Sequence, residues 1–382
     1  MALKPVPITG SVLAWTRAEA GMSPAALADA VGASTEEVIA WESDRRKPST
    51  GQFKELAKRL GRPESFFFLA RPPQIGDAAV SFRTTIEKLG SPASTIEVGK
   101  ELRLAQRVQR VASWLHNQLD SHGPKIPKSS TSAAAASLAK ELQQWLHWDL
   151  NVQLNSTEAQ VTKALRGRLE EHGLIILHIP IDTETGVRGF SLPHSTTPVV
   201  VINTKERYGA RTFSYIHELA HLALGDDSLC LVKTDEGVER WCNEVAACFL
   251  MPEHDVRSFV RARYGGTKIS SLEQVSPVRN RYKVSTQAAA LRLHKLNLSE
   301  PGFYPSVHWA MERRKGGGSS VENVRTRDVV RLQTYGRGYL NLLFEAKASR
   351  KIPETQVLEL LKISRSELSK LEFNARSSVE GG

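Results

Sequence analysis

One short segment, residues 213–224, carries two histidines and a glutamate at a spacing that suits metal chemistry. His217, Glu218 and His221 form the pattern HExxH. Residues four apart lie on one face of an α-helix, so both imidazoles can bind one metal ion, and two imidazoles suit zinc. Glu218, about 100° round the axis, borders the same site. A carboxylate beside a zinc-bound water can accept its proton, so the pattern predicts hydrolysis, most naturally of a peptide bond.

The alternative for this segment is a surface helix with two idle histidines. With 11 histidines in 382 residues, chance HExxH matches would number on the order of 0.02 per chain. The flanking residues Ile216, Leu219, Ala220 and Leu222 are apolar, which predicts a buried helix. Both points favour the metal site.

A catalytic zinc site usually has three protein ligands and one open position, so a third ligand is expected downstream. Glu239 and Glu244 lie on one predicted helix but are about 140° apart round its axis, so only one can face the HExxH helix. Small or hydrogen-bonding residues follow Glu239 at i+3, i+4 and i+7, namely Cys242, Asn243 and Ala246. They permit close approach, and Asn243 could orient a ligand from behind. This favours Glu239 only modestly, because the face of Glu244 is also partly apolar.

The elements that must position these groups form a mixed pattern. An amphipathic helix is predicted over residues 157–172 and ends at Gly173. Apolar runs at 174–179, 187–192 and 199–203 predict three strands before the HExxH helix. The sequence therefore predicts a small α+β domain over residues 156–255.

The first 70 residues have a different, all-α pattern, which predicts five short amphipathic helices. Ser23 and Pro24 supply a cap and a first helical residue, and Gly32 ends that helix. Ser34 and Glu37 have the spacing of a capping box that opens the next one. The order is helix, tight turn, helix.

These residues resemble the XRE class of repressor-type helix-turn-helix domains in their scaffold positions, which are Leu27, Ala28, Gly32, Val38, Trp41, Glu42, Pro48, Leu56 and Ala57. In that class the second helix of the motif, here about 35–43, enters the major groove. The resemblance implies DNA contacts from Thr35 and Glu36, with Arg45, Arg46 and Lys47 as candidate phosphate contacts. Acidic residues on that helix leave protein docking or dimerisation as the alternative.

Residues 155–255 resemble the ImmA/IrrE family of bacterial metallopeptidases. The resemblance rests on a buried strand, HExxH and then the pattern ExxCNxxAAxxLMP, which begins at Glu239. It implies a zincin-like domain in which His217, His221 and Glu239 hold Zn²⁺ and Glu218 is the general base. Members often join an XRE-type domain to this peptidase and cut or inactivate a partner repressor. They occur in stress, mobile-element or toxin–antitoxin operons.

The rest of the chain is predicted to be helical. Residues 71–155 are expected to form a helical connector, with a linker rich in Pro, Lys, Ser and Ala at 124–136. Residues 256–382 are expected to form a helical region with helix-turn-helix-like pairs, interrupted by a linker at 316–320. This region holds 23 Lys and Arg against 11 Asp and Glu. That charge would attract nucleic acid or an acidic protein equally well, or form a solvated face.

Composition limits the expected location of the protein in the cell. No apolar run is long enough to span a bilayer, the first ten residues lack a signal-peptide core, and three cysteines, Cys230, Cys242 and Cys248, cannot all pair. We expect a cytoplasmic protein without a membrane partner and with reduced thiols.

Two functions remain open from the sequence. The first is an intracellular zinc metalloendopeptidase that acts as a regulator by cleaving a partner repressor or antitoxin-type protein. The alternative is a DNA-binding repressor or antitoxin whose peptidase domain is mainly a docking surface. DNA binding through the N-terminal domain is compatible with both, as is a homodimer on paired half-sites.

Overall fold

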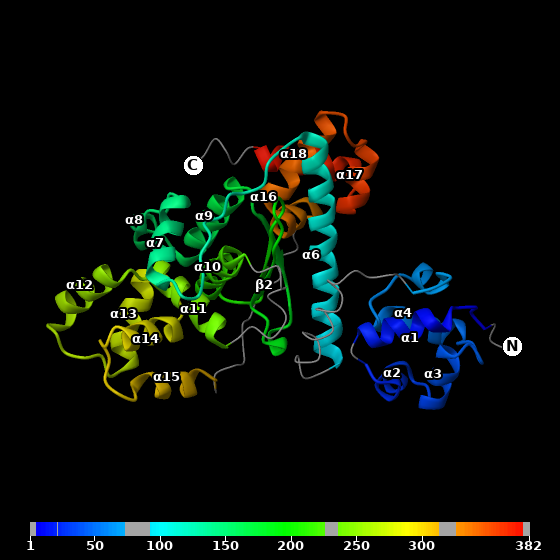
Figure 1. The fold of residues 1–382 in the computed structure, drawn as a ribbon, viewed down its shortest axis with the longest axis horizontal. Helices are drawn as coiled ribbons and strands as arrows, with labels where there is room; N and C mark the ends of the chain where they lie inside the picture. Colours follow the sequence, from blue (N-terminus) through cyan, green and yellow to red (C-terminus); the bar gives the residue numbers. More distant parts are fainter. Residues whose placement is uncertain (1–4, 21, 73–91, 226–235, 313–325, 377–382) are drawn as a thin grey trace. The chain divides into compact units, whose positions relative to one another are not determined.

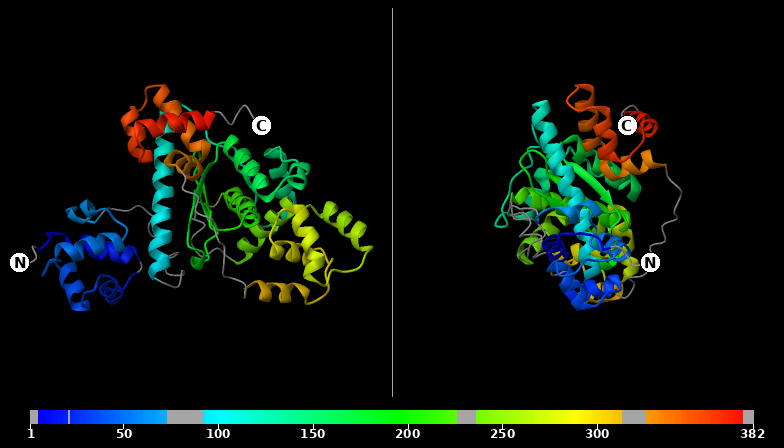
Figure 2. Two further views of the ribbon diagram at one scale, coloured as in Figure 1. Left: turned by 180° about the vertical axis from the view of Figure 1, so that it is seen from behind. Right: turned by 90° about the vertical axis from the view of Figure 1, so that its right-hand side faces the viewer.

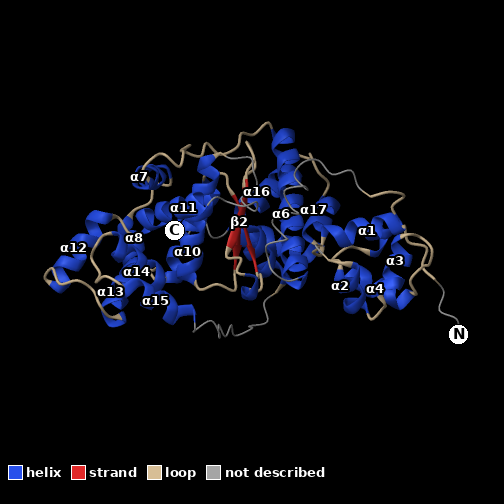
Figure 3. Ribbon diagram, turned by 60° about the horizontal axis from the view of Figure 1, so that its bottom comes forward, coloured by secondary structure: helices blue, strands red, loops and turns tan. Residues whose placement is uncertain are grey.

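The computed structural model describes residues 5–20, 22–72, 92–225, 236–312 and 326–376. These residues form two units, one mainly of residues 1–104 and the other mainly of residues 105–382. Helices predominate, with one small sheet in the second unit (Figure 1, Figure 3). None of the described helices is long and apolar enough to cross a membrane. Cys230, the predicted linker at 316–320 and residues 377–382 lie outside the described residues.

Residues 5–72 of the first unit contain four α-helices in their described part, and a short 3-10 helix stands where the sequence predicted a fifth amphipathic helix. Their bounds are α1 Gly10–Glu19, α2 Pro24–Val31, α3 Thr35–Glu42, α4 Thr50–Arg59 and η1 Glu64–Phe68. The predicted caps are confirmed. The Ser23 side chain accepts a hydrogen bond from the Ala26 amide, and Ser34 and Glu37 form the capping box. Gly32 ends α2 with φ 65°, a left-handed conformation that glycine adopts without strain.

The core of the first unit explains why the motif holds its shape. Leu27, Val38, Trp41 and Leu56 are at most 2% exposed and share one hydrophobic cluster. Burial of such side chains stabilises the fold by about 1.5–3 kcal/mol each relative to exposure. Helix α3 is therefore fixed by its buried face, and its other face is presented outward.

The second unit is built round a three-stranded sheet of order β1-β3-β2. Strand β1 (Ile175–Ile179) pairs in parallel with β3 (Val199–Asn203), and β2 (Gly189–Leu192) pairs antiparallel with β3. The three predicted strands are confirmed within two residues. Helix α9 (Glu158–Glu171) precedes β1 and has the predicted bounds within one residue.

Helices cover both faces of this sheet. Every residue of β3 is buried, and its alternate residues Val200 and Ile202 belong to the core that contains α10 (Tyr208–Leu224). In two opposite views, α10 runs along one side of the sheet and α6 (Pro92–Leu119), in the part from Ala105 onward, along the other (Figure 1, Figure 2). Such double burial explains why β3 is a continuous apolar run.

The same core extends through the helices on the α10 side. They are α7 Ala135–Trp145, α8 Leu150–Asn155, α11 Glu236–Leu250, α12 Glu253–Tyr264, α13 Leu272–Tyr282, α14 Thr286–Lys295 and α15 Phe303–Glu312. Leu138, Leu142 and Leu146 of the α7 region are at most 1% exposed in it. The sequence placed these residues in a connector, and they contribute instead to the core that holds the HExxH helix. We therefore propose that this domain begins before residue 135 rather than at 156.

Three helices follow near the C-terminus: α16 Arg327–Ala348, α17 Glu354–Leu361 and α18 Arg365–Arg376. Helix α16 packs along β1 and is kinked at Gly336, which has φ 68° and ψ 174°. The pairs α13–α14 and α17–α18 each turn through one left-handed residue, Lys283 and Lys362 respectively. A capping Ser then opens the second helix of each pair, which fits the predicted helix-turn-helix-like pairs.

Candidate metal centre

Helices α10 and α11 bring three side chains to one point. The Nε2 atoms of His217 and His221 are 3.2 Å apart. Glu239 Oε2 lies 3.2 Å from His217 Nε2, and Glu239 Oε1 lies 3.3 Å from His221 Nε2. His221 is buried, while His217 and Glu239 are half-buried, so the cluster opens to one side.

The cluster can be tested against the dimensions of a zinc site. Two imidazoles and a carboxylate are a common donor set of catalytic zinc. In a tetrahedral site with bonds of about 2.0–2.1 Å, two donor atoms lie roughly 3.3 Å apart. The two Nε2 atoms are 3.2 Å apart, and they lie 3.2 and 3.3 Å from different oxygens of Glu239, so each pair of atoms matches that spacing. These residues fit a zinc-sized ion, and three protein ligands leave a fourth position for water or substrate.

The two candidates for the third ligand lie on different faces of α11. Glu239 contacts both histidines, whereas Glu244 is exposed and lies 3.9 Å from Lys295 Nζ on α14. The sequence argument alone separated them only modestly. In the structure, the packing of α10 against α11 separates them, because Cys242 and Ala246 are fully buried on the side of Glu239.

Glu218 is held beside the cluster by the sheet. It is 5% exposed, and its Oε2 accepts a hydrogen bond of 2.9 Å from Ser191 Oγ on β2. Its Oε1 lies close to Gly189, where an added Cβ would be 3.6 Å away. Ser191 was not identified from the sequence, since a serine in a short strand gives no signal of its own. This contact fixes the carboxylate of Glu218 while leaving it an acceptor.

Two side chains that follow Glu239 on α11, Cys242 and Asn243, are candidates for supporting the metal ligands. Cys242 is fully buried, and this burial raises the pKa of its thiol, which favours the protonated form. Asn243 is half-buried on α11, and among the described residues it forms no hydrogen bond to the three clustered side chains. The supporting role assigned to Asn243 stays a prediction, and the buried Cys242 is a second candidate for it.

A segment before α7 anchors both helices of the centre. The Ser129 amide donates to the Ala223 carbonyl at 2.9 Å, and Lys128 Nζ donates to the Leu222 carbonyl at 3.3 Å, at the C-terminal end of α10. Trp241 Nε1 on α11 donates to the Ala133 carbonyl at 2.8 Å. The Pro, Lys and Ser content of this stretch predicted a linker. Its backbone partners could not be inferred from composition.

The candidate DNA contacts lie in the first unit. Thr35 opens α3 and is half-buried, and Glu36 is exposed, with its pKa lowered by backbone and Ser34 hydrogen bonds. Arg45 and Arg46 are exposed beyond the end of α3. Lys47 Nζ donates to the Ile8 carbonyl and to Asp44, so its charge serves the fold of the domain.

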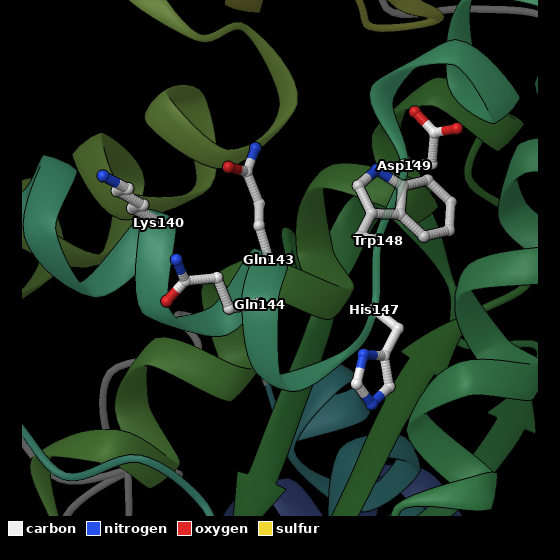
Figure 4. A pocket seen from close by; sticks show the side chains of 6 residues that line it. All are labelled: Lys140, Gln143, Gln144, His147, Trp148 and Asp149. Atoms are coloured by element: carbon white, nitrogen blue, oxygen red, sulfur yellow. The ribbon is translucent and has the colours of Figure 1, made fainter.

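A separate pocket of about 550 Å³ lies at the end of α7 and the turn into α8. Figure 4 shows its lining side chains, which are Lys140, Gln143, Gln144, His147, Trp148 and Asp149. None of these residues belongs to the cluster of His217, His221 and Glu239. This pocket is therefore distinct from the candidate metal centre.

An HExxH helix joined by a glutamate from the next helix and backed by a small mixed sheet defines a metallopeptidase-like domain. Residues 169–294 match the Peptidase_M78 family, described as the IrrE N-terminal-like domain. Residues 13–67 match the HTH_3 helix-turn-helix family. These two matches support the fusion of an XRE-type helix-turn-helix domain to an ImmA/IrrE-type domain that the sequence resemblance predicted. The family match runs through α14, beyond the predicted boundary at residue 255.

No curated protein matches the chain. Among solved structures, the chain is similar to Bacillus thuringiensis PlcR in complex with the peptide PapR7 and DNA. The identity is 14%, over 80% of this chain and 92% of that chain, with a TM-score of 0.16. So low a score supports no argument about shape or function.

Proposed function

We propose that this protein is a zinc-dependent metalloendopeptidase that acts as a regulator by cleaving a partner repressor or antitoxin-type protein. The observation that carries the proposal is the convergence of His217, His221 and Glu239 at ligand spacing, with Glu218 buried beside them. Two independent family matches in one chain, a helix-turn-helix and a peptidase-type domain, support a regulatory role.

Each residue of the centre has a separate task in this proposal. A bound zinc ion would act as a Lewis acid and lower the pKa of water. The imidazoles of His217 and His221 and the carboxylate of Glu239 hold the ion. Glu218, kept in place by Ser191, accepts the proton of the attacking water and can return it to the leaving amine.

The match of residues 169–294 to a peptidase family supports a peptide substrate. Gly189 and Ser191 of strand β2 lie next to Glu218, so the general base is held against the sheet.

The test combines metal content and cleavage in the Glu218→Gln variant. An amide cannot accept the proton of the water, so this variant should keep about one zinc per chain and lose cleavage by at least about 100-fold. The measurement is zinc content, together with mass spectrometry of repressor-type proteins encoded beside this one. Glu244→Gln is the matched control and should keep both properties. Undiminished cleavage by Glu218→Gln would remove this residue from the mechanism.

A second candidate function, repression by DNA binding with the peptidase domain as a docking surface, is supported by the helix-turn-helix match and the outward face of α3. The same variant separates the two functions. If regulation in cells persists in Glu218→Gln, docking is sufficient and turnover is not required. If regulation is lost while zinc and partner binding persist, turnover is required.

A further inference from the structure

Four polar side chains form a hydrogen-bonded chain inside the second unit, away from the metal ligands. Arg166 Nε donates to Glu170 Oε1 at 2.8 Å within α9, and their side chains are 13% and 7% exposed. Arg166 Nη1 lies 2.9 Å from His178 Nδ1 on β1. The same histidine contacts the Tyr215 hydroxyl through Nε2, and Tyr215 is fully buried on α10. The chain thus connects α9, β1 and α10.

The direction of these hydrogen bonds is fixed by charge. A guanidinium can only donate, so His178 Nδ1 accepts from Arg166 and the proton of the ring lies on Nε2, which donates to Tyr215. Burial, and then the neighbouring Arg166, lower the pKa of His178 to about 2, so the ring is neutral. Only one orientation of the neutral His178 ring lets it accept from Arg166 and donate to Tyr215.

Helix α16 docks on the other end of this chain. Arg166 Nη1 donates to the Gln333 carbonyl at 2.8 Å, and the Arg337 amide donates to Glu170 Oε2 at 3.0 Å. Between them, Gly336 breaks the helix with φ 68°. An added Cβ there would overlap Glu170 Oε1 and lie 2.5 Å from Arg166 Nη2. The kink therefore seats α16 directly on the buried ion pair.

The chain ends two residues before the first metal ligand. Tyr215 is about 200° round the axis of α10 from His217, so it fixes the rotation of this helix from its opposite side. A rotation of about 10° would move a side-chain tip by roughly 1 Å. Metal–ligand distances tolerate only about 0.2 Å, so such a rotation would separate the histidines from Glu239 on α11.

We propose that Arg166, His178 and Tyr215 are positioning residues through which the docking of α16 sets the metal affinity of the centre. The helices α16–α18 are then a regulatory module, and any partner or modification that displaces α16 lowers the metal affinity. This inference rests on the proposed function, since it takes His217, His221 and Glu239 as metal ligands.

The experiment measures zinc affinity of the full chain by competition with a chelator. Tyr215→Phe removes one hydroxyl and keeps the ring, and Gly336→Ala obstructs the docking of α16. Each should weaken zinc binding by about 10-fold, at the lower end of the 10–100-fold typical of residues that orient metal ligands. The zinc affinity of the double variant should equal that of the single variant with the lower affinity. Both changes interrupt the same connection, so their effects should not add.

Two matched controls separate positioning from general destabilisation. Tyr282→Phe removes the hydroxyl of another buried tyrosine, one that bonds to Asp255, and should change zinc affinity by less than about 2-fold. Gly302→Ala places a Cβ at φ 81° with no atom within 4 Å, and should behave likewise. The proposal is overturned if either control weakens zinc as much as its test variant, if Tyr215→Phe leaves the affinity unchanged, or if the two test changes are additive.

A second measurement keeps this inference distinct from the proposed function. Amide hydrogen exchange of α10 is followed in the metal-free full chain. Gly336→Ala should speed exchange in α10 relative to Gly302→Ala, because α10 loses its connection to α16. If the wild-type chain binds no zinc, the proposed function fails, and the exchange data alone decide the coupling. Equal exchange in α10 for the two variants would refute it.

Discussion

The helix pairs α10–α11 and α2–α3 use charged and polar side chains in opposite ways. In α10–α11, three donor groups from two helices converge within ligand distance of one another. In the α2–α3 region, the charged groups are directed to partners within the domain: Arg17 forms an ion pair with Glu42, and Lys47 bonds to Asp44 and a backbone carbonyl. Arg45 and Arg46 are exposed beyond the end of α3, and Arg45 Nε donates to Ser43 Oγ.

This contrast shows how far a motif determines function. The convergence of His217, His221 and Glu239 within ligand distance of one another provides the donor set of a metal site. Ion pairs that support a turn, by contrast, stabilise the domain whether or not it binds DNA. The candidate metal centre is therefore a stronger basis for assigning function than the candidate DNA contacts of the first unit.

The greatest loss is expected at the third ligand. Glu239→Gln should weaken zinc binding by more than about 100-fold, beyond the 10–100-fold of supporting residues, because an amide is a poor substitute for a carboxylate ligand. Glu244→Gln, five residues along the same helix, should leave zinc affinity unchanged. Chelator competition measures both. Release of zinc by Glu244→Gln but not by Glu239→Gln would reverse the assignment.

A more moderate loss is expected from the residue behind His221. Cys242→Ala removes a buried thiol from the interface of α10 and α11 and should weaken zinc binding by about 10-fold. Asn243→Ala is the matched change at the next position. We expect it to have less effect, although the sequence favoured Asn243 for this role. A greater loss for Asn243→Ala would restore the prediction from the sequence.

The mildest change is expected at the DNA face. Replacing Arg45 or Arg46 by Gln should weaken DNA binding several-fold for all sequences and reduce the log–log salt slope by about 1 for each phosphate that the variant no longer neutralises. Lys47→Gln should instead lower the thermal stability of the first unit, because this lysine bonds within the domain. Fluorescence anisotropy at several salt concentrations measures the first effect. Absence of DNA binding at low salt would make this domain a protein-docking module.

Local signals in the sequence predicted the elements of both units well. The capping residues Ser23, Ser34 and Thr157 act over three residues, so the helices they open begin where expected. The three strands were predicted from short apolar runs, which double burial of the sheet requires. The candidate ligands His217 and His221 follow a helical spacing that about one turn of α10 determines.

Contacts between distant segments could not be predicted in the same way. Ser191 reaches Glu218 from 27 residues away, and Ser129 reaches Ala223 from 94 residues away. Neither pair has a sequence pattern, because each depends on how the sheet and the segment before α7 pack on α10. Helical periodicity alone could not separate Glu239 from Glu244, because the difference depends on how two helices pack. The family resemblance favoured Glu239.

The contacts of residues 123–133 within the second unit limit where domains of different origin can be joined in such a protein. Gly123 lies so close to the backbone of Thr196 that a Cβ would overlap it, and Ala133 bonds to Trp241. A recombination junction inside this stretch would separate the centre from its own support. We therefore expect exchange of the N-terminal domain to be tolerated only when the junction lies upstream of Gly123, so that residues 123–155 stay with the HExxH helix.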